Sequence, residues 1–374
     1  MKIVIAPNSF KNSLNALQVA NAIERGLKKS KLNPATQLIP IADGGDYTLE
    51  VLIEHFRGEY REVTVEDPLQ RPVKARYGLL QQGKIAVVEY TKASGLSLLK
   101  PDEYNPMQAS SYGTGQIMKK CMEEGAKEIW LGVGGSATVE AGGGLLPALD
   151  IAFLDENGQP VNRGASGIAK IAKIDWQQVP AKIQKTRIKI LSDVENHLLG
   201  DQGAARVFGP QKGADAPMVE HLEEILTRYA GLVKNATGND INEIKGGGAA
   251  GGIPASLSAF LHTEIVSGAD FLLQQMGFDK AIADAQVLIT AEGKIDEQTL
   301  SGKGPAIAAK WARKAGLFVI GLGGSIPTQP DSEYFDVLLA IGNQPQSLEE
   351  ALKLTAENLE RTSYMVGNLL AVKG

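Results

Sequence analysis

The chain has 374 residues, 22% of them charged, and a net charge of −5. Without a basic run, this balance argues against a nucleic-acid partner. No uninterrupted apolar run reaches the roughly 18 residues that a membrane span needs. The four apolar residues 3–6, which precede Pro7, are too few for a signal peptide, so we expect a cytoplasmic protein. The length favours two domains over one, and the oligomeric state stays open, a homodimer included.

The N-terminal region alternates short apolar strands with amphipathic helices. A β-branched run at 2–6 and an apolar run at 38–41 each lead into a polar loop, and helical patterns follow at 14–27 and 48–56. This order implies parallel strands joined by crossover helices. Ligands of such sheets lie at the carboxyl ends of the strands, where the loops around Lys11 and Asp43 are expected.

The middle of the chain has a different pattern. Three strands are expected at 60–65, 73–80 and 85–90, with turns and no helix between them, which indicates antiparallel pairing. Alternation of strands and helices returns near residue 285. We therefore predict an α/β protein with a Rossmann-like or flavodoxin-like doubly wound domain formed by both termini, and a second α/β domain inserted into it. The predicted boundaries are 1–66 with 285–374 for the first domain and 67–284 for the second.

A glycine-rich loop follows the apolar run 129–131. Gly134 and Gly135 allow a tight turn, Ser136 and Thr138 add hydroxyl groups, and a helical pattern begins near residue 145. A glycine loop between a strand and a helix offers N–H groups, near the positive end of the helix dipole, to an anion such as phosphate. The alternative is that the glycines serve only the close packing of strand on helix.

Three carboxylates each follow an expected strand: Asp43, Asp193 and Glu292. An acid at the end of a parallel strand faces the ligand-binding edge, where it can take a proton from a hydroxyl group or hold a metal ion. Asp193 is the candidate ligand for Mg²⁺. The alternative for each acid is an Asx turn or a helix cap.

Three lysines, Lys11, Lys212 and Lys303, lie in or beside polar glycine or serine loops. A lysine in such a loop can bind phosphate as a point charge. The alternative for each is a solvated surface side chain.

A dinucleotide-binding fingerprint competes with the phosphate interpretation. Gly132, Gly134 and Ala137 have its spacing, and Asp155 lies at a suitable distance beyond them. This pattern would make the protein an NAD-dependent dehydrogenase. A Walker-type P-loop and a Cys/His zinc pattern are absent from the sequence.

Several longer motifs occur in a fixed order along the chain: 6–11 (APNSFK), 42–45 (ADGG), 113–115 (GTG), 134–138 (GGSAT), 192–194 (SDV), 208–214 (FGPQKGA), 248–252 (GAAGG), 292–296 (EGKID) and 302–303 (GK). Together they resemble the bacterial type I glycerate kinase family, which phosphorylates D-glycerate with ATP. The resemblance implies two α/β domains with a cleft, a small hydroxy acid as substrate, and ATP with Mg²⁺ as cofactors.

On this hypothesis, Asp43 or Asp193 is the catalytic base and Lys11 assists it. The expected substrate and phosphate contacts are Ser9, Lys11, Gly134, Gly135, Ser136, Thr138, Lys212, Glu292 and Lys303.

The chain also departs from the family pattern. The departures fall at Asn8, Tyr47, Tyr112, Val139, Glu140 and Glu195, where the family usually has other residues. Because they cluster at the motif loops, they leave open which acid is the acceptor. They also leave open a binding protein that has lost turnover.

Overall fold

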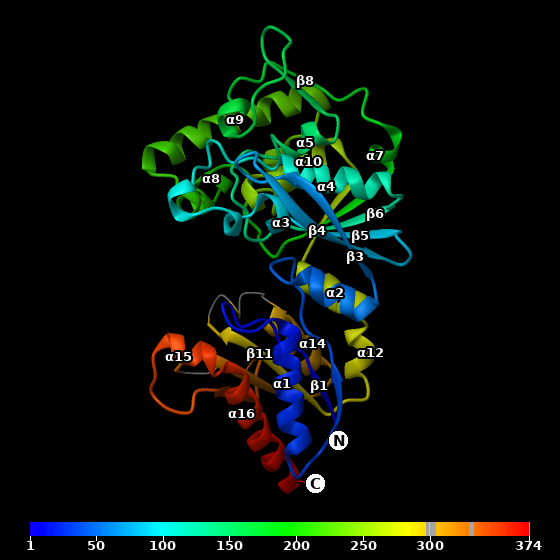
Figure 1. Cartoon of the computed structure of the whole chain (residues 1–374), viewed down its shortest axis with the longest axis vertical. Helices are drawn as coiled ribbons and strands as arrows, with labels where there is room; N and C mark the ends of the chain where they lie inside the picture. Colours follow the sequence, from blue (N-terminus) through cyan, green and yellow to red (C-terminus); the bar gives the residue numbers. More distant parts are fainter. Residues whose placement is uncertain (297–298, 300–303, 329–332, 374) are drawn as a thin grey trace. The chain divides into compact units, whose positions relative to one another are not determined.

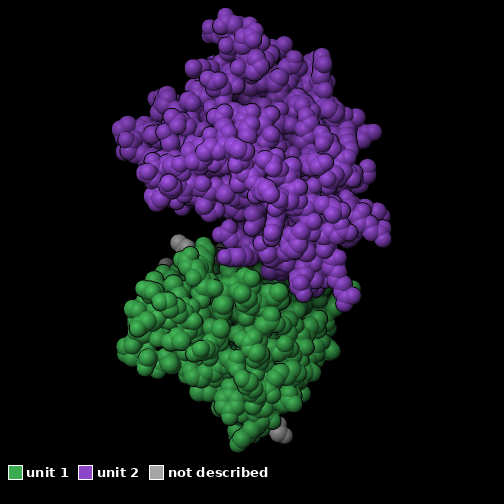
Figure 2. All heavy atoms as spheres, in the orientation of Figure 1, with its two compact units in different colours: residues 1–43, 268–374 green, residues 44–267 purple. Residues whose placement is uncertain are grey.

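The computed structural model describes residues 1–296, 299, 304–328 and 333–373. Its contacts divide the chain into two compact units, coloured separately in Figure 2: unit 1 is 1–43 with 268–374, and unit 2 is 44–267. The predicted architecture, in which both termini form one α/β domain around an inserted second one, is confirmed. The division falls at 43/44 and 267/268, whereas the sequence placed it at 66/67 and 284/285.

Unit 1 is built on a five-stranded parallel sheet. Its strands, in chain order, are β1 (Lys2–Ile5), β2 (Ala35–Leu38), β11 (Val287–Lys294), β12 (Phe318–Ser325) and β13 (Val337–Ala340). They lie in the order β13-β12-β11-β1-β2, all parallel. Counted within the unit this is the order 2-1-3-4-5, the flavodoxin-like arrangement, and the chain reverses its direction of winding between β1 and β11.

Helices cover both faces of this sheet. They are α1 (Ala16–Lys29), α11 (Gly268–Gln275), α12 (Phe278–Ile282), α14 (Gly304–Lys314), α15 (Leu348–Lys353) and α16 (Thr355–Leu370). Right-handed crossovers that run in opposite directions place α1 and α14 on opposite faces. Helices α1 and α16 lie side by side in Figure 1. Their approach is close because a Cβ on Gly26 would lie 2.1 Å from the carbonyl oxygen of Glu360.

Unit 2 is built on a six-stranded mixed sheet. Its strands are β3 (Glu59–Glu66), β4 (Pro72–Leu80), β5 (Ile85–Glu89), β6 (Glu128–Gly132), β9 (Arg187–Leu191) and β10 (Thr263–Val266), in the order β10-β9-β6-β5-β4-β3. The first three pair antiparallel, as predicted, and β5, β6, β9 and β10 are parallel. A separate antiparallel pair joins β7 (Ala152–Leu154) to β8 (Lys173–Asp175).

The helices of unit 2 are α2 (Thr48–Phe56), α3 (Thr91–Ser94), α4 (Tyr112–Glu123), α5 (Leu145–Ala148), α6 (Ala165–Ile168), α7 (Ala181–Lys185), α8 (Ala204–Phe208), α9 (Ala216–Thr237) and α10 (Ile253–Phe260). Helix α2 packs on β4 and β5, and β3 pairs with β4 along its whole length. The predicted boundary at 66/67 therefore falls inside one sheet.

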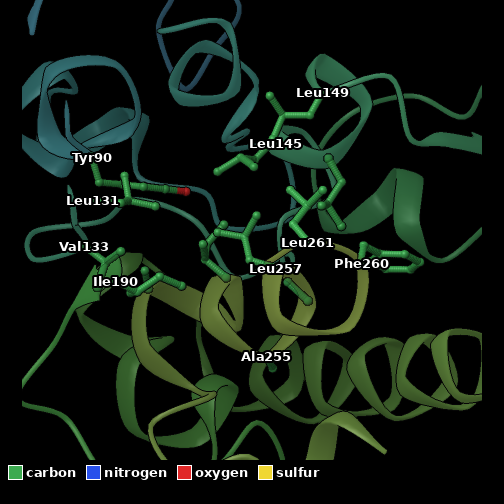
Figure 3. Close-up of a cluster of buried hydrophobic side chains, with 14 of the residues drawn as sticks. Tyr90, Leu131, Val133, Leu145, Leu149, Ile190, Ala255, Leu257, Phe260 and Leu261 are labelled. Atoms are coloured by element: carbon green, nitrogen blue, oxygen red, sulfur yellow. The ribbon is translucent and has the colours of Figure 1, made fainter. Parts of the chain in front are cut away.

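The core of unit 2 is mostly aliphatic. Figure 3 shows part of it, where Leu131 and Ile190 from the sheet, Leu145 from α5 and Leu257 from α10 are buried together. Tyr90, at the end of β5, is completely buried among them. Cys121 is buried in α4. Within the described residues, the helices are too short or too polar to cross a membrane.

Two expectations differ from the structure. The strand expected from the apolar run at 38–41 lies at Ala35–Leu38. The loop expected around Lys212 contains a turn of 3-10 helix at Pro210–Lys212. That turn determines where Lys212 points.

Candidate active site

The glycine loop of unit 2 leaves the carboxyl end of β6 and packs tightly on residues 44–45. A Cβ on Gly132 would lie 2.5 Å from the carbonyl oxygen of Gly44, and the Gly134 N–H donates to that oxygen at 3.3 Å. The backbone of residues 44–45 therefore leaves no room for a side chain at Gly132 or Gly134. Gly135 is exposed and has a φ of +66°, which favours glycine.

The helical pattern expected near residue 145 corresponds to α5, which begins at Leu145 as predicted but spans only four residues. Residues 133–144 contain no helix, and Ala141 and the glycines at 142–144 form turns. The dipole of so short a helix, separated from Gly135 by these turns, does not account for anion binding at the glycine loop.

Lys212 supplies the positive charge of this region. Its side chain is 1% exposed, and its Nζ donates to Ser136 Oγ at 2.9 Å and to the Thr138 carbonyl oxygen at 2.7 Å. Burial lowers the pKa of Lys212 to about 7. Among the residues that the structure describes, no carboxylate pairs with it. The alternative interpretation of Lys212 as a solvated surface lysine was therefore wrong.

Hydrogen bonds of buried groups hold the same loop in position. Thr138 Oγ1 and the Tyr90 hydroxyl are 2.7 Å apart, and Ala137 N–H donates to the Ser94 carbonyl oxygen. Ser136, Thr138 and Lys212 are thus brought together, as the phosphate interpretation requires. The sequence analysis missed Tyr90, whose hydroxyl group follows the apolar run 85–88 and Glu89 at the end of the strand.

Glu140 is a second buried ionisable group that the sequence analysis did not place. Its carboxylate accepts hydrogen bonds from the N–H groups of Ser111, Gly144 and Gly164 and from the Ser111 hydroxyl. Burial raises the pKa of Glu140 to about 7 against these donors. The side chain joins three loop segments, so we interpret it as a structural support of the glycine loop.

Asp193 directly follows β9, as predicted, and is exposed. Its Oδ1 accepts a hydrogen bond of 2.7 Å from Ser267 Oγ. A Cβ on Gly44 would lie 2.6 Å from the carbonyl oxygen of Leu191. Both chain connections into unit 2, at residues 44 and 267, therefore enter beside the carboxyl end of β9.

Asp43 lies at the other end of one of these connections, in unit 1. Its carboxylate accepts a hydrogen bond from Asn8 Nδ2 at 3.2 Å, and Asn8 Oδ1 accepts one from the Ser9 N–H at 2.7 Å. A Cβ on Gly268 would lie 2.1 Å from the Asp43 carbonyl oxygen. The loops around Lys11 and Asp43 thus meet at one edge of the sheet, as the parallel topology predicts.

A cavity of about 560 Å³ opens at this edge of unit 1. Ser9, Lys11 and Glu292 line it, three of the predicted site residues. Glu292 was expected after a strand but lies within β11, which extends to Lys294. Its carboxylate accepts a hydrogen bond from Thr299 Oγ1 at 2.8 Å. Lys303 lies outside the described residues.

A model of the glycerate kinase family matches residues 3–371 of the chain. The chain is 40% identical to the glycerate kinase of Halalkalibacterium halodurans over 96% of both chains. It is 37% identical to the glycerate 2-kinase of Escherichia coli K12, over 100% of this chain and 98% of the relative. The chain belongs to the glycerate kinase family. A crystal structure of a Salmonella typhimurium LT2 protein assigned as glycerate kinase 2 has the same fold, with a TM-score of 0.89 at 37% identity over 100% of this chain and 99% of the other.

Membership in the glycerate kinase family makes the protein a phosphotransferase with an alcohol group as acceptor. The dehydrogenase alternative has no support in the structure, because the dinucleotide fingerprint needs a helix directly after its glycines. Asp155, its proposed ribose ligand, accepts hydrogen bonds from the N–H groups of Asn157 and Gln159 within a turn.

The chemistry of the donor set is compatible with Mg²⁺. Proteins commonly bind this ion through one or two carboxylates, and phosphate oxygens and water complete its shell. Asp193 is an exposed carboxylate at the carboxyl edge of the unit 2 sheet, and a serine hydroxyl orients it. Clusters of three or more acidic, histidine or cysteine side chains that could hold a metal are absent from the described part of the chain.

Proposed function

We propose that the protein is an ATP-dependent kinase that phosphorylates a hydroxyl group of D-glycerate. Family membership supplies the reaction class, and the single structural observation that carries the proposal is Lys212. Keeping Lys212 charged is costly unless an anion binds beside it, because its two partners are neutral and no carboxylate in the described part of the chain pairs with it. The anionic groups of the two proposed substrates are the phosphates of ATP and the carboxylate of D-glycerate.

Phosphoryl transfer depends on positioning and on charge neutralisation rather than on covalent chemistry by the protein. A bound anion would raise the pKa of Lys212 and keep the ammonium charged. Its remaining N–H can then donate to the anion, because Ser136 and Thr138 occupy only two of its three donors. The exposed backbone at Gly135 leaves room for a ligand to approach this loop.

The acceptor hydroxyl must lose a proton as the new P–O bond forms. Asp193 and Asp43 are the two candidate bases, one in each unit, and each lies at the carboxyl edge of its sheet. Bound Mg²⁺ would neutralise phosphate oxygens, and Asp193 is its proposed protein ligand. Asp43 is the better base if Asp193 holds the ion, since a carboxylate bound to a cation is a weaker proton acceptor. The use of ATP also favours a cytoplasmic protein.

The test is ADP release by the purified chain with ATP and Mg²⁺, screened against D-glycerate, L-glycerate and a panel of hydroxy acids and sugar acids. We expect turnover with D-glycerate and a monophosphorylated acid as the product, identified by phosphorus NMR. ATP binding without ADP release on any acceptor would indicate a binding protein in place of a kinase. Turnover with a different acid alone would support a kinase whose acceptor is that acid and not D-glycerate.

A further inference from the structure

The cavity of unit 1 differs from the Lys212 site in its lining, and the proposed function leaves its ligand unassigned. We infer that this cavity binds the nucleotide, with the adenosine end against its apolar wall and the phosphates toward Ser9 and Lys11. The inference rests on the proposed function and assigns one of its two substrates to one unit.

The position of the cavity is the first argument. Its floor is formed by the loop after β1 and the carboxyl ends of β11 and β12, which touch one another: a Cβ on Gly324 would lie 2.6 Å from the Gly293 carbonyl oxygen, and one on Gly293 would lie 3.4 Å from the Phe10 Cα. These segments flank the point between β1 and β11 where the winding reverses. In flavodoxin-like sheets this point receives a ligand the size of a nucleotide.

The size of the cavity is the second argument. About 560 Å³ lies within the range of pockets that enclose ligands the size of a nucleotide. Glycerate is a three-carbon acid with almost no apolar surface and would fill only a small part of this volume. A site for glycerate is expected to be small and polar.

The third argument is that one side of the cavity lining is apolar and the other is polar. Phe10, Ile341, Leu348 and Leu352 form an apolar wall. Leu348 is 75% exposed although it begins helix α15 at the cavity. An exposed leucine beside a cavity gains from a flat apolar partner such as a purine ring, which would remove its surface from water.

The polar end of the cavity is lined by two lysines and two acids, so its formal charges balance, and the pairing decides which lysine can contact a phosphate. Of the two acids there, Glu292 accepts a hydrogen bond from Thr299 and Asp296 pairs with Lys294 at 3.0 Å. Lys11 is exposed, lines the same end and is paired with no carboxylate in the described part of the chain. It is therefore the cation that can contact phosphate oxygens there.

A side-chain amide offers a contact for the base. Gln346 lines the cavity, and its Oε1 is buried without a hydrogen-bond partner among the described residues. Such an oxygen favours a ligand with a donor, and the exocyclic amino group of adenine is one.

The test uses a variant whose side chain fills the cavity, and it measures nucleotide binding and the KM for each substrate. Ala351 lines the wall on α15, so Ala351→Trp places an indole ring in the space assigned to adenosine. Lys353→Trp is the matched control, because Lys353 lies on the same helix, is exposed and does not line the cavity. Adenosine and ADP binding are measured by calorimetry, and KM is measured for ATP and for D-glycerate with the other substrate saturating.

For Ala351→Trp we expect loss of adenosine binding and a rise of at least tenfold in the KM for ATP, with the KM for D-glycerate changed less than twofold. Lys353→Trp should match the wild type. A rise in the KM for D-glycerate alone, or no change in either substrate, would overturn the assignment. If the wild type released no ADP but Ala351→Trp still abolished adenosine binding, the kinase proposal would fail and the nucleotide assignment would stand.

A second variant keeps the inference testable if Ala351→Trp does not fold. Lys11→Ala should weaken ADP binding about fivefold or more, because it removes a charge at the phosphate end. Adenosine has no phosphate, so its binding should stay within twofold of the wild type. Equal weakening of both ligands, or of neither, would contradict the proposed orientation.

Discussion

Each unit has a lysine at a loop that follows a parallel strand: Lys11 lies in the loop after β1, and Lys212 contacts the loop after β6. The environments of these two lysines are opposite. In unit 2, Lys212 is buried against Ser136 and Thr138, and burial lowers its pKa to about 7. In unit 1, Lys11 is exposed beside a wide cavity with an apolar wall. A buried lysine remains charged only when an anion binds beside it, whereas an exposed lysine stays hydrated and charged with or without a ligand. We therefore expect unit 2 to govern turnover and unit 1 to govern nucleotide affinity.

The largest effect is expected at Lys212. Lys212→Met keeps the length and the apolar stem of the side chain but removes its charge and its donors. We expect kcat/KM for D-glycerate to fall by about 10³-fold, the size seen when one donor is removed from a preorganised charge site. Lys234→Met, which removes a lysine from an exposed ion pair with Asp240, is the control. A loss of less than tenfold at Lys212 would mean that unit 2 does not govern turnover through this side chain.

The next effect separates the two candidate bases. Asp193→Asn and Asp43→Asn should each lower kcat by on the order of 10²-fold, because both remove a carboxylate from a predicted catalytic edge. The base variant should also lose the acidic limb of the pH profile of kcat, and the variant at a metal ligand should raise the Mg²⁺ concentration needed for half-maximal rate. A variant with full activity would remove its residue from the mechanism.

A smaller effect concerns stability. Burial lowers the pKa of Lys212 from its usual 10.5 to about 7 in the folded chain, so between these pH values the unfolded chain binds more protons. The free energy of unfolding should therefore rise with pH between about 7 and 10.5 and should not change through this group below pH 7. From pH 7 to pH 8.5 the rise amounts to about 2 kcal/mol.

Chemical denaturation of the wild type and of Lys212→Met at the two pH values measures this contribution. The variant should be more stable than the wild type by a margin that shrinks as the pH rises. A margin independent of pH would show that Lys212 is charged in the folded chain. Repeating the titration with inorganic phosphate tests whether an anion restores the charge, because phosphate should then stabilise the wild type and not the variant.

The sequence predicted those features that depend on local pattern. The parallel strands around 2–6 and 287–290, the antiparallel strands from 60 to 90 and the position of Asp193 after β9 all follow from apolar periodicity and turn residues. The cavity of unit 1 could not be predicted, because it needs loops almost 300 residues apart in sequence to touch.

Burial was the other feature that the sequence could not supply. Nothing in residues 208–214 distinguishes a buried lysine from a solvated one, since the decisive contacts with Ser136 and Thr138 come from a loop more than 70 residues away. The sequence placed the boundary at 66/67 and not at 43/44 for a similar reason. Helix α2 continues the β-α pattern of the N-terminal region, and only its packing on β4 and β5 assigns it to unit 2.

The smallest effect is expected at Leu348. Its exposed side chain at the cavity should become covered by the base, so Leu348→Ala loses part of that burial and should weaken ADP and adenosine binding about fivefold, with kcat unchanged. Alanine suits the first turn of α15, so the helix should persist. Leu369→Ala is the matched control in the same unit, because Leu369 is 69% exposed and does not line the cavity. Equal affinities in the two variants would remove Leu348 from the nucleotide site, and a fall in kcat at Leu348 would break the division of roles between the two units.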